Sequence, residues 1–319
     1  MSNHLLRLIV QRILLGILTL FVISILIFLG TEFLPGDVAQ TILGQSATPE
    51  NLAALRTKLG LDQPPLTRYF NWLGGLLQGD LGTTLTSNRP VAEVIGGRLG
   101  NTLFLASVAA VIAIPLAILL GLLAVRFRDS WLDKTISVGT LTTISLPEFF
   151  VGYVLVLIFA MILKWAEFPS TIFEGMGFWE RLEKIALPVL TLTLVVLAHM
   201  MRMTRAALIG IMSSPYIEMA TLKGVSPFKI ITRHALPNSI APIVNVVVLN
   251  LAYLIVGVVV VEVVFVYPGL GQLLVDHVSK RDLPMVQACG LIFAAIYVGL
   301  NMFADIVSII SNPKLRFPK

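Results

Sequence analysis

Long runs of apolar residues recur along this chain, and shorter polar segments separate them. A helix needs about 20 apolar residues to cross the ~30 Å hydrocarbon core of a bilayer. Backbone groups in lipid must be hydrogen-bonded internally, which favours helices, and the alternating segments of a membrane β-barrel are not seen. The pattern predicts an all-α membrane protein with six transmembrane helices, at 10–31, 101–125, 136–163, 187–210, 241–266 and 286–311.

The first apolar run resembles a signal peptide only in its position. It follows Arg7 and Arg12 and extends from Ile13 to about Thr31. This is longer than the apolar region of a cleaved signal peptide, and no small-residue cleavage pattern follows it. We therefore expect the run to be retained as the first span.

Charged residues make up only 13% of the chain, about half of what a soluble domain carries. The segments 1–12, 126–134, 200–240 and 312–319 together hold 13 basic residues and three acidic ones, whereas the opposite side holds 10 basic and 12 acidic residues. The positive-inside rule then predicts that both termini lie in the cytoplasm. Because the basic residues are spread over several loops, the chain does not present the basic stripe of a nucleic-acid-binding protein.

The segment 32–100 is expected to form an ordered cap on the outer, periplasmic side, followed by a five-helix core over 101–311. It is too apolar and aromatic for a plain linker, with Tyr69, Phe70 and Trp72 close together. A Leu/Ala pattern predicts a short helix over 51–59, capped by Thr48 or Asn51 and ended near Gly60. Membrane lipid is a further expected partner.

The loop 213–238, called the elbow below, carries two short helical patterns. Pro215 suits a first helical turn, and Gly224 suits the residue that ends the first helix, over 216–223. The second helix is expected over 228–235, before Pro237. Ile217, Leu222 and Phe228 are expected to be exposed among basic residues, a combination that favours an interaction surface over a solvated loop.

The elbow resembles the EAA loop of binding-protein-dependent ABC importer permeases. The matching positions are Glu218-Met219-Ala220, Gly224 and His234-Ala235-Leu236-Pro237, with Met219 departing from the usual alanine. The stretches 59–85, 98–106, 261–274 and 304–316 are also similar to the dipeptide/oligopeptide/nickel permeases, so the resemblance covers nearly the whole chain in order.

This resemblance implies a type I ABC importer transmembrane domain in a bacterial inner membrane. The implied partners are a second homologous permease in a heterodimer or a second copy, two ATP-binding subunits and an extracytoplasmic substrate-binding protein. The coupling residues would be Glu218, Ala220, Lys223, Gly224, Phe228, Arg233, His234 and Pro237, with Glu218, Ala220 and Gly224 at the centre of the docking surface.

Three acidic residues, Glu148, Glu262 and Asp305, fall within or at the ends of predicted spans. Charged groups there are costly unless they face protein or water, so each is a candidate for lining a pathway. The alternative is an ion pair or a helix end that fixes packing. A kinked, polar lining is the hypothesis for Glu148, which follows Pro147.

The chain is not expected to be an enzyme or to hold a cofactor. It lacks the phosphate-binding motif G-x-x-x-x-G-K-[ST] and any histidine or cysteine pattern for a metal. ATP and magnesium would therefore be bound by the partner subunits. Short peptides are the substrate that the resemblance favours, while nickel chelates, oligosaccharides and opines remain open. An ion-gradient transporter and an intramembrane protease are weaker alternatives, because neither internal repeats nor a convincing catalytic set is found.

Overall fold

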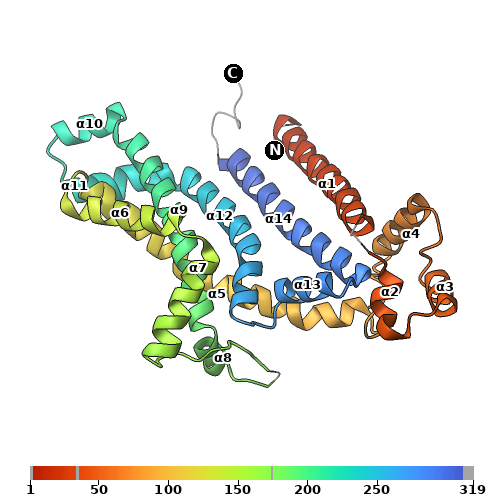
Figure 1. Cartoon of the computed structure of the whole chain (residues 1–319). Helices are drawn as coiled ribbons and strands as arrows, with labels where there is room; N and C mark the ends of the chain where they lie inside the picture. The colour runs from red at the N-terminus through yellow and green to blue at the C-terminus, as the bar shows by residue number, and fades with distance from the viewer. Residues whose placement is uncertain (1–2, 34–35, 174, 312–319) are drawn as a thin grey trace. The chain divides into compact units, whose positions relative to one another are not determined.

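The computed structural model describes residues 3–33, 36–173 and 175–311, and the described residues form helices joined by loops, without a β-strand. The expected cytoplasmic tail over 312–319 lies outside this part of the chain. The chain divides into two compact units, which are described separately (Figure 1). Unit 1 comprises Met1–Gly16, Phe104–Tyr267 and Ile296–Lys319, and unit 2 comprises Ile17–Leu103 and Pro268–Ala295.

Unit 2 contains the segment that was expected to form the outer cap. Its complete helices are α2 (Val38–Leu43), η1 (Gly44–Ser46), α3 (Pro49–Lys58), α4 (Pro65–Leu77) and α13 (Leu270–Ser279). It also includes parts of the long helices α1 (Asn3–Glu32), α5 (Val91–Arg126) and α14 (Leu283–Ser311). The predicted short helix is confirmed as α3, whose N-cap Thr48 accepts a hydrogen bond from the backbone N–H of Asn51.

A buried carboxylate holds the turn before α5 in place. Asp282 accepts hydrogen bonds from the backbone N–H of Leu85 at 3.1 Å and from the N–H and hydroxyl of Thr86 at 3.2 and 2.9 Å. Buried residues of α5, α13 and α14, including Val91, Leu270 and Met285, form an apolar cluster beside it. Because a buried charge needs several donors, Asp282 fixes this turn against the start of α14.

Unit 1 contains the remaining helices. They are α6 (Trp131–Ser145), α7 (Glu148–Leu155), η2 (Val156–Ile162), α8 (Phe178–Lys184), α9 (Ala186–Met212), α10 (Pro215–Leu222), α11 (Pro227–Lys229), η3 (Ile230–Ala235) and α12 (Leu236–Val264). Helices α9 and α12 pack along each other, and α6 and α7 pack against α9. Close packing is possible where α5 meets α9 because Gly121 has no side chain: a Cβ there would lie 2.9 Å from Thr204 Cγ2.

Among the described residues, five helices are long and apolar enough to cross a membrane, and the third predicted span is a broken pair. The prediction of one helix over 136–163 is wrong in this respect, since α6 ends at Ser145 and α7 begins at Glu148 with a bend of 103°. The cause is Pro147: its ring disfavours the helical conformation for Leu146, whose ψ is 135°. Counting this pair as one span gives the expected six.

The elbow and the intramembrane acids

The first half of the elbow is a helix closed by a glycine turn. Helix α10 ends at Leu222, and Gly224 follows with φ of +74°. The N–H of Gly224 donates to the carbonyl of Thr221, and the N–H of Val225 donates to that of Ala220. These two bonds form a Schellman motif, which satisfies the last carbonyls of the helix and requires a left-handed residue at Gly224.

The second half continues into the next span instead of ending before Pro237. Helix α11, the π-helical segment η3 and α12 form one apolar helix over Pro227–Val264. Pro237 lies in the first turn of α12 and has no N–H to donate. The wider π-helical turn just before it accommodates this loss without ending the helix. The prediction of a separate short helix over 228–235 is therefore wrong, and the elbow is joined directly to α12.

The inner face of the elbow is part of the core of unit 1. Ile217, Ala220, Ile230 and Ala235 are buried in one cluster with residues of α5 and α9, including Leu208. The expectation that Ile217 is exposed is wrong, because its side chain points into this cluster. Ala220 is buried in the same cluster, so its side chain helps to hold α10 against α5 and α9 and is not presented on the exposed face of the elbow.

The outer face of the elbow is exposed and mixes apolar with charged side chains. Leu222 is 75% exposed, and the other exposed members are Tyr216, Glu218, Met219, Lys223, Gly224, Phe228, Lys229, Arg233 and Pro237. His234 is half-buried. A Cβ built on Gly224 would meet nothing within 4 Å, so the space beside this turn is open. In Figure 1, α10 lies beyond the end of α9.

An ion pair that the sequence analysis did not single out ties α6 to α9 near the elbow. Arg205 donates from Nε and Nη2 to the two carboxylate oxygens of Asp133, at 3.0 and 2.7 Å. Asp133 is buried and also accepts from the N–H of Asp129 at 3.1 Å. The local signal for Asp133 is its position three residues after the N-cap Ser130, but nothing local indicates Arg205, which is 72 residues away.

The three intramembrane acids have different surroundings, and the structure does not bring them together. Asp305 of α14 forms an ion pair of 3.1 Å with Arg12 of α1. Glu262 is fully buried near the end of α12, close to Tyr267. Burial raises the pKa of the Tyr267 phenol far above its usual value; the Glu262 charge adds to this rise, and Arg181, which hydrogen-bonds the phenol, opposes it. Both positions fit the packing alternative.

Glu148 is the exception among these acids. Its carboxylate makes no hydrogen bond or ion pair with any residue that the structure describes. Its carboxylate lies against Gly257 of α12, where a Cβ on the glycine would be 2.7 Å from Oε1. The absence of a side chain at Gly257 therefore makes room for the Glu148 carboxylate.

Several apolar helices long enough to cross a membrane define a polytopic membrane protein. Two family models match the chain: residues 113–317 match the inner membrane component of binding-protein-dependent transport systems, and residues 5–106 match the N-terminal part of that component. The chain belongs to this family of ABC importer permeases and resides in the inner membrane.

Curated relatives match over nearly their whole length. The chain is 36% identical to a glutathione transport system permease protein of Escherichia coli (strain K12) over 309 residues, which is 97% of this chain and 98% of the relative. It is also 36% identical to a putative peptide transport system permease protein of Brucella abortus (strain 2308) over 315 residues, covering 97% and 99% of the two chains. Membership of this family implies partnership with an ATPase and a binding protein.

Proposed function

We propose that this chain forms half of the translocation path for short peptides, which an extracytoplasmic binding protein delivers, and that the elbow docks a partner ATPase. The permease would pair with a homologous second permease, and two ATPase subunits would bind ATP and magnesium. Both termini and the elbow would lie in the cytoplasm. The names of the relatives, which are permeases of glutathione and peptide transport systems, support peptides as the substrate class.

The observation that carries the docking role is the two-faced elbow. Its buried face fixes α10 on α5 and α9, while its exposed face presents Leu222, Phe228 and Met219 beside Lys223 and Lys229. Exposed apolar side chains ringed by charge are typical of protein interaction sites. Glu218 and Gly224 are on this exposed side, as the resemblance requires, whereas Ala220 would act by supporting the helix.

Glu148 is proposed to line the path. An unpaired carboxylate within a membrane segment is unfavourable unless it faces water or a partner. A free peptide carries an N-terminal ammonium group, and Glu148 could stabilise that charge as the peptide passes. Glu148→Gln should then reduce uptake of a peptide with a free N-terminus more than uptake of its N-acetylated form, and an equal effect on both would exclude this role.

The docking proposal can be tested in native membranes. A tagged chain is purified in mild detergent, and the proteins that remain bound are identified and assayed for ATP hydrolysis. Leu222→Glu should release the ATPase. The matched control is Leu77→Glu, since Leu77 of α4 is similarly exposed, at 83%, but belongs to unit 2. Retention of the ATPase by the Leu222 variant, or equal loss in both variants, would contradict the role of the elbow.

A further inference from the structure

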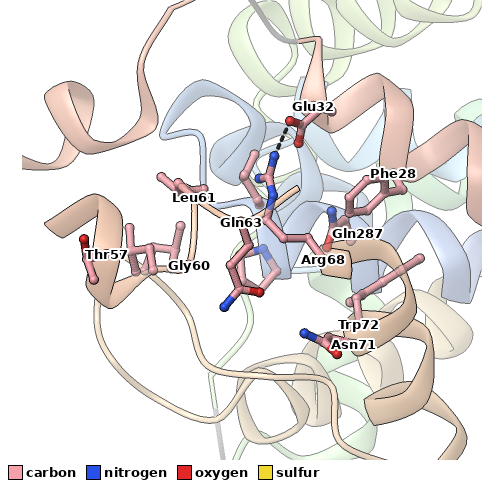
Figure 2. Close-up of a pocket in the computed structure, with 14 residues that line it drawn as sticks. Phe28, Glu32, Thr57, Gly60, Leu61, Gln63, Arg68, Asn71, Trp72 and Gln287 are labelled. Atoms are coloured by element: carbon pink, nitrogen blue, oxygen red, sulfur yellow. Dashed lines mark hydrogen bonds and ion pairs between the residues drawn. The ribbon is translucent and has the colours of Figure 1, made fainter. Parts of the chain in front are cut away.

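Unit 2 contains a cavity of about 440 Å³ to which the function proposed above assigns no role. This volume is within the ~300–1,000 Å³ range of ligand pockets. Figure 2 shows that side chains of α1, α4 and α14 and of the turn after α3 converge on it. A second cavity of about 330 Å³ shares Glu32, Leu61, Arg68 and Leu283 with the first. The two cavities therefore adjoin each other and are considered as one site.

One wall of the cavity is aromatic and held in place. The rings of Phe28 and Trp72 lie 6.2 Å apart, and Phe28 also packs edge-on against Tyr69 at 5.4 Å. The Tyr69 hydroxyl is hydrogen-bonded to that of Ser24 at 2.9 Å, which ties α4 to α1. This wall provides a preformed surface for an apolar side chain.

The charges of the site neutralise each other. Arg68 pairs with Glu32 in the first cavity, and Arg56 pairs with Asp37 in the second. The Arg56 guanidinium beside Asp37 holds the pKa of that carboxyl below its usual value, so this pair remains charged at neutral pH. Because each cation has its own carboxylate, the site does not favour a phosphate, a lipid headgroup or a metal ion.

The remaining polar groups suit an uncharged ligand with both donors and acceptors. The guanidinium of Arg68 makes a single hydrogen bond within the described residues, to Glu32, and its buried Nε has no partner there. The side-chain amides of Gln63, Asn71 and Gln287 also line the cavity, and an amide offers two donors and an acceptor. The peptide main chain is the ligand chemistry that matches such groups.

We propose that these adjoining cavities of unit 2 bind a short extended peptide segment, with a main-chain carbonyl facing Arg68, a main-chain amide facing Gln63, and one side chain against Trp72 and Phe28. The segment comes either from the transported peptide or from a loop of the binding protein. Both sources rest on the proposed function. The site itself rests only on the contacts within unit 2.

A cysteine in the cavity can report on occupancy. The only native cysteine, Cys289, is buried in α14, so Asn71→Cys places one accessible thiol of this chain in the site. Gln78→Cys, just after the end of the same helix α4 and outside both cavities, is the matched control. The purified assembly is treated with a maleimide, and labelling of this chain is followed by mass spectrometry with alanyl-phenylalanyl-alanine, with the binding protein, or with short-chain phosphatidylglycerol.

We expect the tripeptide or the binding protein to slow labelling at Asn71→Cys at least about tenfold, and to change labelling at Gln78→Cys by less than about twofold, as for a ligand well above its dissociation constant. Protection by the tripeptide identifies the transported peptide as the source, and protection by the binding protein alone identifies its loop. Protection by phosphatidylglycerol alone would overturn the proposal.

Two further results separate this site from the proposed function. If the tripeptide is taken up but does not slow labelling of Asn71→Cys, the cavity proposal is overturned and the proposed function stands. If the tripeptide slows labelling but is not taken up, the proposed function is overturned and the cavity proposal stands. In the background of Asn71→Cys, Arg68→Lys keeps a charge for Glu32 but removes the fork of donors. It should raise the half-protecting concentration about tenfold, which corresponds to one lost hydrogen bond. An unchanged value would exclude Arg68 from the site.

Discussion

Replacing Asp133 with asparagine should open the end of α6 while the rest of unit 1 stays folded. The Asp133 side chain is 5% exposed, and its carboxylate accepts hydrogen bonds from Nε and Nη2 of Arg205, whose side chain is 28% exposed. Breaking a fully buried ion pair on one side costs about 3–5 kcal/mol. Because Arg205 can be partly rehydrated, we expect about 2–3 kcal/mol for Asp133→Asn.

Hydrogen exchange of the intact assembly measures this loss of local stability at the start of α6. A change of about 2–3 kcal/mol in local opening corresponds to exchange that is about 30–150 times faster over 129–140. Arg205→Lys keeps the positive charge but loses the planar pair of N–H donors that contacts both carboxylate oxygens. It should therefore increase the exchange rate less than Asp133→Asn does. The exchange of α13, in unit 2, should not change in either variant.

The control is an ion pair of similar length on the surface. Arg89 and Glu93 are 2.6 Å apart in a one-turn helical pair, and both are more than half exposed. Exposed pairs contribute about 0.2–1 kcal/mol, so Glu93→Gln should speed local exchange by less than about fivefold. If Asp133→Asn has no larger effect than Glu93→Gln, the buried fork adds no net stability and the reasoning from burial is refuted.

Three other substitutions test local features of the structure. Gly121→Val would place a side chain against Thr204 and should lower the melting temperature of the assembly, by a destabilisation of about 1–3 kcal/mol; Gly210→Ala, which meets nothing, should not. Asp282→Asn weakens three hydrogen bonds to the turn before α5, so hydrogen exchange of that turn should become about tenfold faster or more. An unchanged exchange rate would show that the Asp282 carboxylate does not stabilise the turn. Gly224→Ala should destabilise the elbow by about 1–2 kcal/mol through its positive φ alone, seen as faster exchange of α10 and not as a clash; equal exchange in both forms would contradict this.

Hydropathy predicted the spans well because a lipid-exposed helix must be apolar along about 20 residues, whatever it packs against. It failed at Pro147 for a related reason. Mean hydropathy depends on composition and not on the direction of the axis, so α6 and α7 together look like one span despite their bend of 103°. A proline allows either a kink or a break, and the packing of α7 on α9 and α12 was not visible in the sequence.

The candidate site was predictable only in its local parts. The glycine turn of the elbow follows from Gly224, because few other residues take a positive φ after a helix. The side of α10 that faces solvent is determined by its packing on α5 and α9, which the sequence does not reveal. The exposure predicted for Ile217 was wrong for this reason. The pairs of Asp133 with Arg205 and of Asp282 with the turn at 85–86 join residues 72 and about 196 positions apart in sequence, and no periodicity signals such contacts.

The continuity of the elbow with α12 determines how force from a partner would travel. If α11 ended before Pro237, as the sequence suggested, a flexible joint would separate the docking surface from the span and absorb its displacement. Instead, the helix continues from Pro227 to Val264, with the π-helical turn of η3 in place of a break. On the other side of Gly224, α10 packs on α9, which Arg205 ties to α6. A displacement of the elbow would therefore enter α12 directly and α6 through α9, so the surface proposed to bind the ATPase is mechanically joined to α12, which packs beside Glu148.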